Sequence, residues 1–177
     1  MHVLSRTLWV LLVPVLVVFA APFVWQVTTG DTFMSVTGVS MEPTYRVGDV
    51  LVVQDPTGHD LAVVGQPVVV EFTPGDAGTQ YVHRVHEITA DGAVLKGDDN
   101  EVPDPVTVTE QDVVGTPRAV LAGDLGTLYR VSQSWGARGV VGLLVLGLAL
   151  LPTGPRPAPS PDAAPTGRRA MRAAAGG

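Results

Sequence analysis

The chain of 177 residues contains no cysteine, so disulfide bonds, a thiol nucleophile and thiolate metal ligands are all excluded. Positive charge is scarce as well: 11 Lys and Arg stand against 17 Asp and Glu, and the formal net charge is −6. No cluster of basic residues with interleaved aromatic residues is present, which argues against a nucleic-acid-binding protein. The four histidines lack the spacing of metal ligands, such as His-x-x-x-His on a helix. We therefore expect neither a metal nor another cofactor.

Long uncharged runs occur only towards the two ends of the chain, and the first covers residues 8–25. As a helix this run would be about 27 Å long, close to the roughly 30 Å hydrocarbon core of a bilayer. Trp9 and Trp25 lie at its ends, and membrane interfaces favour such aromatic rings. A cleaved secretory signal is the alternative, although the run is long for one. We predict a short N-terminal end and a transmembrane anchor over residues 1–27.

The second apolar run, Gly139 to Leu151, is rich in glycine. Extended back through Trp135, it becomes just long enough to span a bilayer, with Arg138 reaching towards the headgroups. We predict a second transmembrane helix over residues 131–152, the alternative being a helix that lies in the interface. Residues 153–177 consist mainly of Pro, Ala, Gly and Arg, so we predict a disordered tail.

The arginines orient this arrangement in the membrane. Arg6 precedes the first run, and further arginines follow the second at positions 156, 168, 169 and 172. Positively charged flanks favour the cytoplasmic side. We therefore predict a cell-membrane protein with both ends in the cytoplasm and its middle part outside.

The middle part, residues 28–130, is long enough for one modest domain and is predicted to be all-β and mostly antiparallel. Short segments rich in β-branched residues alternate there with Gly, Pro and Asp clusters. Asp91-Gly92 is a hairpin-turn signal, and no helical period of useful length is evident. The predicted strands cover residues 49–54, 67–72, 81–89 and 113–121.

Two segments of this domain carry residues suited to nucleophilic catalysis. Ser40 lies in Gly38-Val39-Ser40-Met41-Glu42-Pro43-Thr44, and His83 lies in Tyr81-Val82-His83-Arg84-Val85. A serine hydroxyl needs a base within hydrogen-bond reach, and a histidine oriented by a carboxylate is such a base. Strand alternation places His83 on one face, with Tyr81, Val85 and Glu87, and His86 on the other. Only one of the two histidines can therefore face Ser40, and an exposed structural role is expected for His86.

The acid partner remains open between Asp98 and Asp104 when the residues are considered alone. Asp104 lies between two prolines, which would make its loop stiff. Lys96 is a possible alternative base, but neighbouring carboxylates would favour its charged form. We interpret Lys96 as a structural or surface residue.

Three segments resemble the conserved boxes of type I signal peptidases. Residues 36–49 are similar to the serine box, residues 81–85 to the second box, and Lys96-Gly97-Asp98-Asp99-Asn100 to the third. His83 occupies the position of the general base, as in the Ser-His subtype of the endoplasmic reticulum, archaea and some Gram-positive bacteria. The resemblance covers residues 36–121 and the anchor. It implies Asp104 as the triad acid and Asp98 as a second, supporting acid.

Two departures from the pattern concern the site directly. Val39 stands immediately before Ser40, where many relatives of this subtype have glycine, and Gly38 comes one position earlier. Asp99 replaces an asparagine of the third box, and Pro103-Asp104-Pro105 stands where paired aspartates are common. These changes affect the shape of the oxyanion hole and the identity of the acid.

The sequence thus predicts a membrane-bound serine endopeptidase that removes N-terminal signal peptides from secreted preproteins through a Ser-His-Asp acyl-enzyme mechanism. Its predicted partners are preprotein signal peptides and the lipid bilayer, and no feature indicates an oligomeric state. One alternative is a self-cleaving or dedicated processing peptidase with few substrates. The other is an inactive, membrane-anchored β-domain that binds partners.

Overall fold

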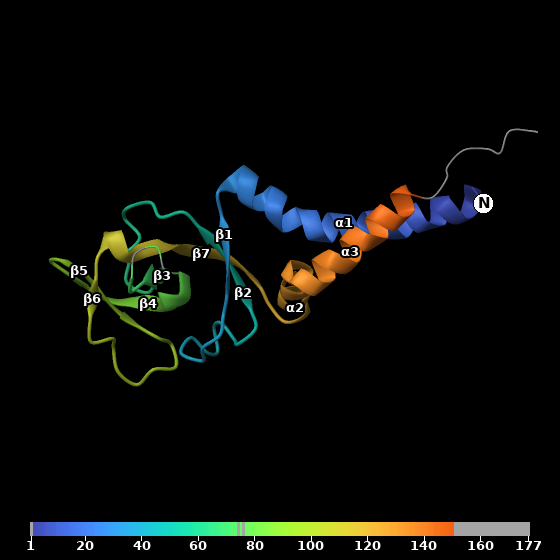
Figure 1. Cartoon of the computed structure of the whole chain (residues 1–177). Helices are drawn as coiled ribbons and strands as arrows, with labels where there is room; N and C mark the ends of the chain where they lie inside the picture. The colour runs from blue at the N-terminus through green and yellow to red at the C-terminus, as the bar shows by residue number, and fades with distance from the viewer. Residues whose placement is uncertain (1, 74, 76, 151–177) are drawn as a thin grey trace, which may run out of the picture.

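A computed structural model of the protein describes residues 2–73, 75 and 77–150 (Figure 1). The predicted tail at residues 153–177 lies outside the described residues, as does the end of the predicted second span. In chain order the elements are α1 (His2–Thr29), β1 (Thr32–Ser35), β2 (Val50–Gln54), β3 (Pro67–Glu71), η1 (Ala77–Thr79), β4 (Gln80–Thr89), β5 (Gly92–Lys96), β6 (Thr107–Val108), η2 (Glu110–Asp112), β7 (Val113–Leu121), α2 (Asp124–Gln133) and α3 (Trp135–Ala149).

The strands form one seven-stranded sheet in the order β1-β2-β7-β3-β4-β5-β6, and every neighbouring pair is antiparallel. This confirms the predicted class of fold for the domain. The predicted hairpin is present, since Thr89 pairs with Gly92 across the turn. Gly92 has φ of +151°, and a Cβ there would lie 2.0 Å from the carbonyl oxygen of Val108. Glycine is therefore required where β6 passes this turn.

The centre of the sheet is buried on both faces. Side chains alternate between faces along a strand, yet Val68, Val69 and Val70 of β3 are all at most 1% exposed. Val68 and Val70 belong to a core cluster with residues of β4 and β5. Val69 belongs to a second cluster with residues of β2 and of the serine segment, residues 36–49. The uninterrupted run of valines is explained by this two-sided burial. His83 lies on β4, next to this rigid centre.

Helix α2 was not predicted, because the domain was expected to contain no helix up to residue 130. The side of α2 that packs on the domain carries Gly126, Tyr129 and Ser132, which follow one another at intervals of three residues. Tyr129 stacks on Phe33 of β1 with ring centroids 4.9 Å apart. The short strands β1 and β6 were not predicted either.

Glycine 126 explains how closely α2 docks on the sheet. A Cβ at Gly126 would lie 2.6 Å from the carbonyl oxygen of Leu121 and 2.8 Å from that of Gly48. Only glycine allows the helix to approach both backbone segments at once. Helix α2 therefore packs directly on the β-domain.

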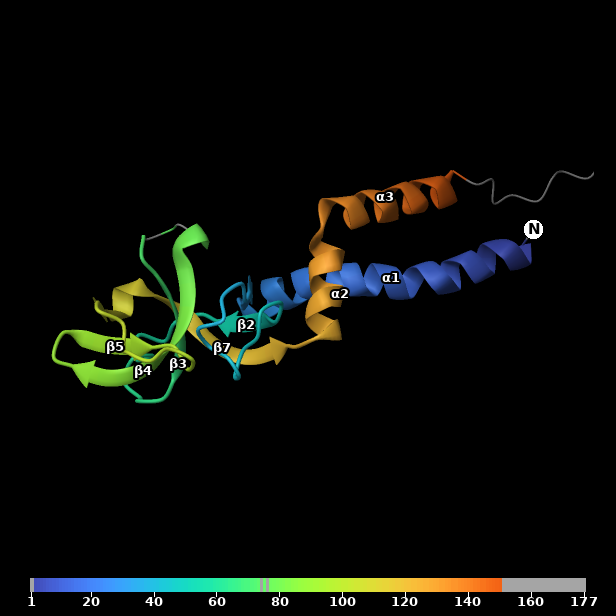
Figure 2. The ribbon, with the colours of Figure 1, turned by 90° about the horizontal axis from the view of Figure 1, so that it is seen from below.

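The apolar helices project away from the sheet on one side (Figures 1 and 2). The window Leu12–Thr29 of α1 has a mean hydropathy of 1.8 and is only 6% buried, so by length and composition α1 is able to cross a membrane, and a signal sequence has the same properties. Of the predicted helix over residues 131–152, α3 covers Trp135–Ala149, and a 67° bend around Ser134 separates it from the end of α2. Alone, α3 is about 22 Å long and shorter than the hydrocarbon core. A second span is therefore not established.

Candidate active site

Ser40, His83 and Asp104 are connected by two hydrogen bonds. The Oγ atom of Ser40 lies 3.0 Å from Nε2 of His83, and Nδ1 of the same ring lies 2.7 Å from Oδ2 of Asp104. The side chain of His83 is 11% exposed. The three side chains come from a turn, a strand and a loop that are separated by 43 and 21 positions in the chain. The structure thus brings together the three residues for which the sequence predicts catalysis.

The turn that carries Ser40 is held from two sides. Met41, the next residue, is 1% exposed and packs in the second core cluster. The carbonyl oxygen of Ser40 accepts a hydrogen bond of 2.9 Å from the N–H of Asp99. A Cβ at Gly97 would lie 2.5 Å from the same oxygen. The glycine of the third box is therefore needed because the serine backbone lies directly against it.

The imidazole of His83 is positioned by the sheet and by an aromatic neighbour. His83 pairs with Val68 of β3, and the ring of Tyr81 meets its ring edge-on at a centroid distance of 5.0 Å. The ring of Phe72 in turn stacks on that of Tyr81 at a centroid distance of 4.6 Å. Burial raises the pKa of Tyr81 to about 12, and the negative charges of Asp104 and Asp112 act in the same direction. The phenol beside the imidazole is therefore neutral.

Asp104 is attached to the sheet through its own backbone. Its N–H donates a hydrogen bond of 2.8 Å to the carbonyl oxygen of Leu95 in β5. The loop that follows β5 thus turns back towards β5, and this places the carboxylate of Asp104 beside His83. This contact with β5 adds to the stiffness that the flanking prolines impose on the loop.

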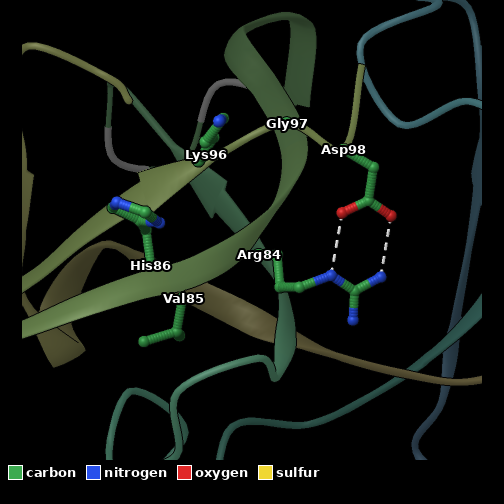
Figure 3. A pocket seen from close by; sticks show the side chains of 6 residues that line it. All are labelled: Arg84, Val85, His86, Lys96, Gly97 and Asp98. Atoms are coloured by element: carbon green, nitrogen blue, oxygen red, sulfur yellow. Dashed lines mark hydrogen bonds and ion pairs between the residues drawn. The ribbon is translucent and has the colours of Figure 1, made fainter. Parts of the chain in front are cut away.

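Asp98 faces different partners. Its two carboxylate oxygens accept hydrogen bonds of 2.8 Å each from Nε and Nη2 of Arg84 (Figure 3). Oδ2 accepts a third, of 2.5 Å, from the hydroxyl of Thr44. Nη1 of Arg84 donates to the carbonyl oxygen of Gly65 at 2.6 Å. Asp98 thereby connects the serine segment to β4 and, through Arg84, to the loop before β3.

The electrostatic effect of this cluster is a more acidic carboxyl group. Hydrogen bonding to Arg84 is the main cause that lowers the pKa of Asp98 from its ordinary value, with Thr44 and the nearby positive charge adding to it against the opposing effect of burial. The same pair raises the pKa of the Arg84 guanidinium. The described donors to the Asp98 carboxylate are side chains. These hydrogen bonds therefore connect the side chains of Thr44, Arg84 and Asp98, which come from three separate segments of the chain.

The faces of β4 are not those that simple alternation predicts. A β-bulge lies between Val85 and Glu87, so that Val85 pairs with Leu95 and Glu87 with Val94. Adjacent residues of β5 point to opposite faces, and Glu87 therefore lies on the face opposite to Val85 and His83. The prediction that Glu87 shares the face of His83 was wrong. His86, the extra residue of the bulge, is exposed.

Lys96 pairs with Arg84, and its side chain therefore leaves the sheet on the face opposite to His83. With His86 and the Arg84–Asp98 pair it borders a shallow pocket of about 190 Å³ (Figure 3). Its placement disfavours Lys96 as the base for Ser40. In the part of the chain that the structure describes, no group of His, Asp and Glu is arranged to hold a metal ion.

Next to the nucleophile, backbone N–H groups are available for an incoming oxygen. Among the described residues, neither Ser40 nor Met41 donates its N–H to a backbone carbonyl. At Gly38 a Cβ would meet no atom within 4 Å, so no contact within the protein requires glycine there. The space beside Gly38 is therefore open.

A hydroxyl, an imidazole and a carboxylate in this series form the constellation of serine hydrolases, which recurs on unrelated folds and is recognised by geometry. The family model described as peptidase S24-like matches residues 17–116, a segment that contains all three residues. Because the match covers more than half of the chain, the protein belongs to the peptidase S24-like family. A comparison with curated proteins finds no significant match.

Proposed function

We propose that the protein is a membrane-anchored signal peptidase of the Ser-His kind, a serine endopeptidase that removes signal peptides from preproteins. The observation that carries this proposal is the Ser40–His83–Asp104 series of hydrogen bonds in a peptidase S24-like domain. The apolar helix α1, which leads directly into that domain, supports a membrane-bound substrate.

In the proposed mechanism, Ser40 attacks the carbonyl carbon at the cleavage site while Nε2 of His83 takes its proton. Asp104 keeps the other ring proton on Nδ1 and stabilises the imidazolium that forms. The backbone N–H groups at Ser40 and Met41 are candidates for binding the oxyanion. His83 then returns the proton to the leaving amine. Water hydrolyses the acyl-enzyme by the same steps and regenerates the serine.

The substrate is proposed to be a preprotein held in the bilayer by its own apolar segment. The open space beside Gly38 is suited to a substrate backbone that passes close to Ser40. The resemblance to signal peptidases implies small residues just before the cut. We further propose that the β-domain lies outside the cytoplasm, on the basis of the arginine placement.

The test is cleavage of a preprotein by the full chain in proteoliposomes, with the Ser40→Ala variant as control. Mass spectrometry of the products should locate one cut at the end of the signal peptide, and the control should give none. Incubation of the enzyme without substrate tests for self-cleavage, and a panel of preproteins separates a general peptidase from a dedicated one. Absence of any cleavage by a folded enzyme would favour the inactive binding domain.

A further inference from the structure

A buried carboxylate lies at the point where the apolar helix α1 meets the sheet. Asp31 is 1% exposed, and its Oδ2 accepts a hydrogen bond of 2.8 Å from the indole Nε1 of Trp25 near the end of α1. Nη1 of Arg118 on β7 lies 3.3 Å from both carboxylate oxygens. Asp31 therefore connects a helix at the edge of the domain to the strand β7 inside the sheet.

The connection between α1 and β1 leaves little freedom for the helix to swing. Only Gly30 and Asp31 separate Thr29, the last residue of α1, from Thr32, the first of β1. The N–H of Gly30 donates to the carbonyl oxygen of Gln26 at 2.9 Å, and the N–H of Asp31 donates to the Thr29 hydroxyl at 3.1 Å. Both residues of the linker are thus held by the end of the helix.

Burial makes the partners of Asp31 important. A carboxylate removed from water is costly unless hydrogen bonds and an opposite charge compensate it. The side chain of Arg118 is 47% exposed and therefore partly screened by solvent. The indole of Trp25 supplies the shortest of these contacts, although it contributes nothing to the backbone hydrogen bonds of α1 itself. Its hydrogen bond fixes the helix to the domain.

We propose that Asp31 is a positioning residue that, with Trp25 and Arg118, locks α1 onto the sheet and so sets the height of Ser40 above the bilayer. Ser40 follows the end of β1 by five residues, and β1 begins directly after the joint. If the contact of Trp25, Asp31 and Arg118 fixes α1 to the sheet, cleavage is restricted to peptide bonds that lie at the same distance from the membrane surface as Ser40. This inference rests on the proposed function.

The test compares two tryptophans that each border an apolar helix. Trp25→Phe keeps an aromatic ring, although a smaller one, and removes the hydrogen bond to Asp31. Trp135→Phe is the matched control, because the indole of Trp135 is 86% exposed and makes no hydrogen bond to a described residue. In proteoliposomes we expect kcat/KM for a membrane-held preprotein to fall about tenfold in Trp25→Phe, as for a lost hydrogen bond to a charged group. The control should match the unaltered protein.

A soluble peptide that contains only the cleavage site separates positioning from folding. Trp25→Phe should cleave this peptide at the rate of the unaltered protein, since Ser40 and His83 are untouched. An equal loss for both substrates would overturn the proposal, because it would show that Trp25 only supports the fold. Unchanged cleavage of the membrane-held preprotein by Trp25→Phe would overturn it as well.

A second readout does not depend on activity. Because the chain has no cysteine, Val63→Cys, at an exposed loop position between β2 and β3, accepts a single fluorophore. Energy transfer from this label to headgroup acceptors in nanodiscs reports the height of the domain. We expect one narrow distribution for the unaltered chain and for Trp135→Phe, and a broader one for Trp25→Phe. If the distribution for Trp25→Phe is as narrow as that of the unaltered chain, the proposed role of Trp25 and Asp31 in fixing α1 to the sheet is wrong. This conclusion holds even if the protein proves not to be a signal peptidase.

Discussion

Replacing Asp104 with asparagine tests whether this carboxylate is the acid of the triad. Asparagine has nearly the same size, and the backbone hydrogen bond from residue 104 to Leu95 does not depend on the side chain. If the amide oxygen faces Nδ1 of His83, the ring keeps its tautomer but loses the negative charge 2.7 Å away that stabilises the imidazolium. If the amide NH₂ faces Nδ1, the ring proton moves to Nε2, which then cannot accept the proton of Ser40.

Both orientations of the amide slow the reaction. The corresponding change in another Ser-His-Asp peptidase lowers kcat about 10⁴-fold, which amounts to about 5 kcal/mol of transition-state stabilisation. We expect Asp104→Asn to lose about 10³- to 10⁴-fold in kcat. Its thermal unfolding should shift by only a few degrees, because the amide can still form a hydrogen bond with His83 and one such bond contributes about 1 kcal/mol.

The assay is single-turnover cleavage of a preprotein, with thermal unfolding followed by circular dichroism on the same samples. Asp98→Asn is the matched control, since it is the same change six positions earlier in the same loop. If Asp104→Asn cleaves at a normal rate while a folded Asp98→Asn does not, the assignment of the two acids is wrong and must be exchanged.

The remaining predictions concern the other groups of the site. Ser40→Ala should abolish preprotein cleavage without affecting expression or membrane insertion, and near-normal cleavage would end the hydrolase proposal. His83→Ala should be inactive and Lys96→Ala active, and activity should fall on acidification because a protonated imidazole cannot accept a proton; the opposite pattern of variants would indicate a Ser-Lys dyad. Asp98→Asn should lose about 1–2 kcal/mol of unfolding free energy at pH 7, measured by urea titration. Since the folded-state pKa of Asp98 is lowered from 3.8, its contribution is complete above that pH and disappears as pH falls through the lowered value, so the variant and the unaltered protein should converge in acid. Protease added to sealed cells should reach residues 36–121, and their protection would reverse the proposed topology.

Much of the fold was predictable because its signals are local. The strands β2, β3, β4 and β7 are short runs of β-branched residues bounded by Gly, Pro and Asp, and they occur close to the expected positions. The hairpin at Asp91-Gly92 and the apolar helix α1 depend on similarly short stretches of sequence. Ser40 and His83 could be selected because their neighbours form recognisable motifs.

Other features depend on contacts that no local pattern contains. The bulge at His86 exists because of how β4 pairs with β5. It places Glu87 on the face opposite to His83, whereas simple alternation predicts the same face. Helix α2, which precedes the bend at Ser134, packs through Gly126 on the backbone of Gly48, a segment far away in the sequence. The apolar run alone predicted a helix that starts at residue 131, whereas α3 starts at Trp135, after the bend.

The sequence by itself determined the residue types of the site and their order, since a serine box and a histidine strand are encoded within a few positions each. It left two aspartates as candidates, because residues 98 and 104 belong to one loop and differ only in where that loop leads. The tertiary structure separates them: the N–H of Asp104 binds Leu95 and its carboxylate reaches His83, whereas Asp98 meets Arg84 and Thr44. The distances between segments depend on how the whole sheet packs, and the same packing buries Asp31 between an apolar helix and β7.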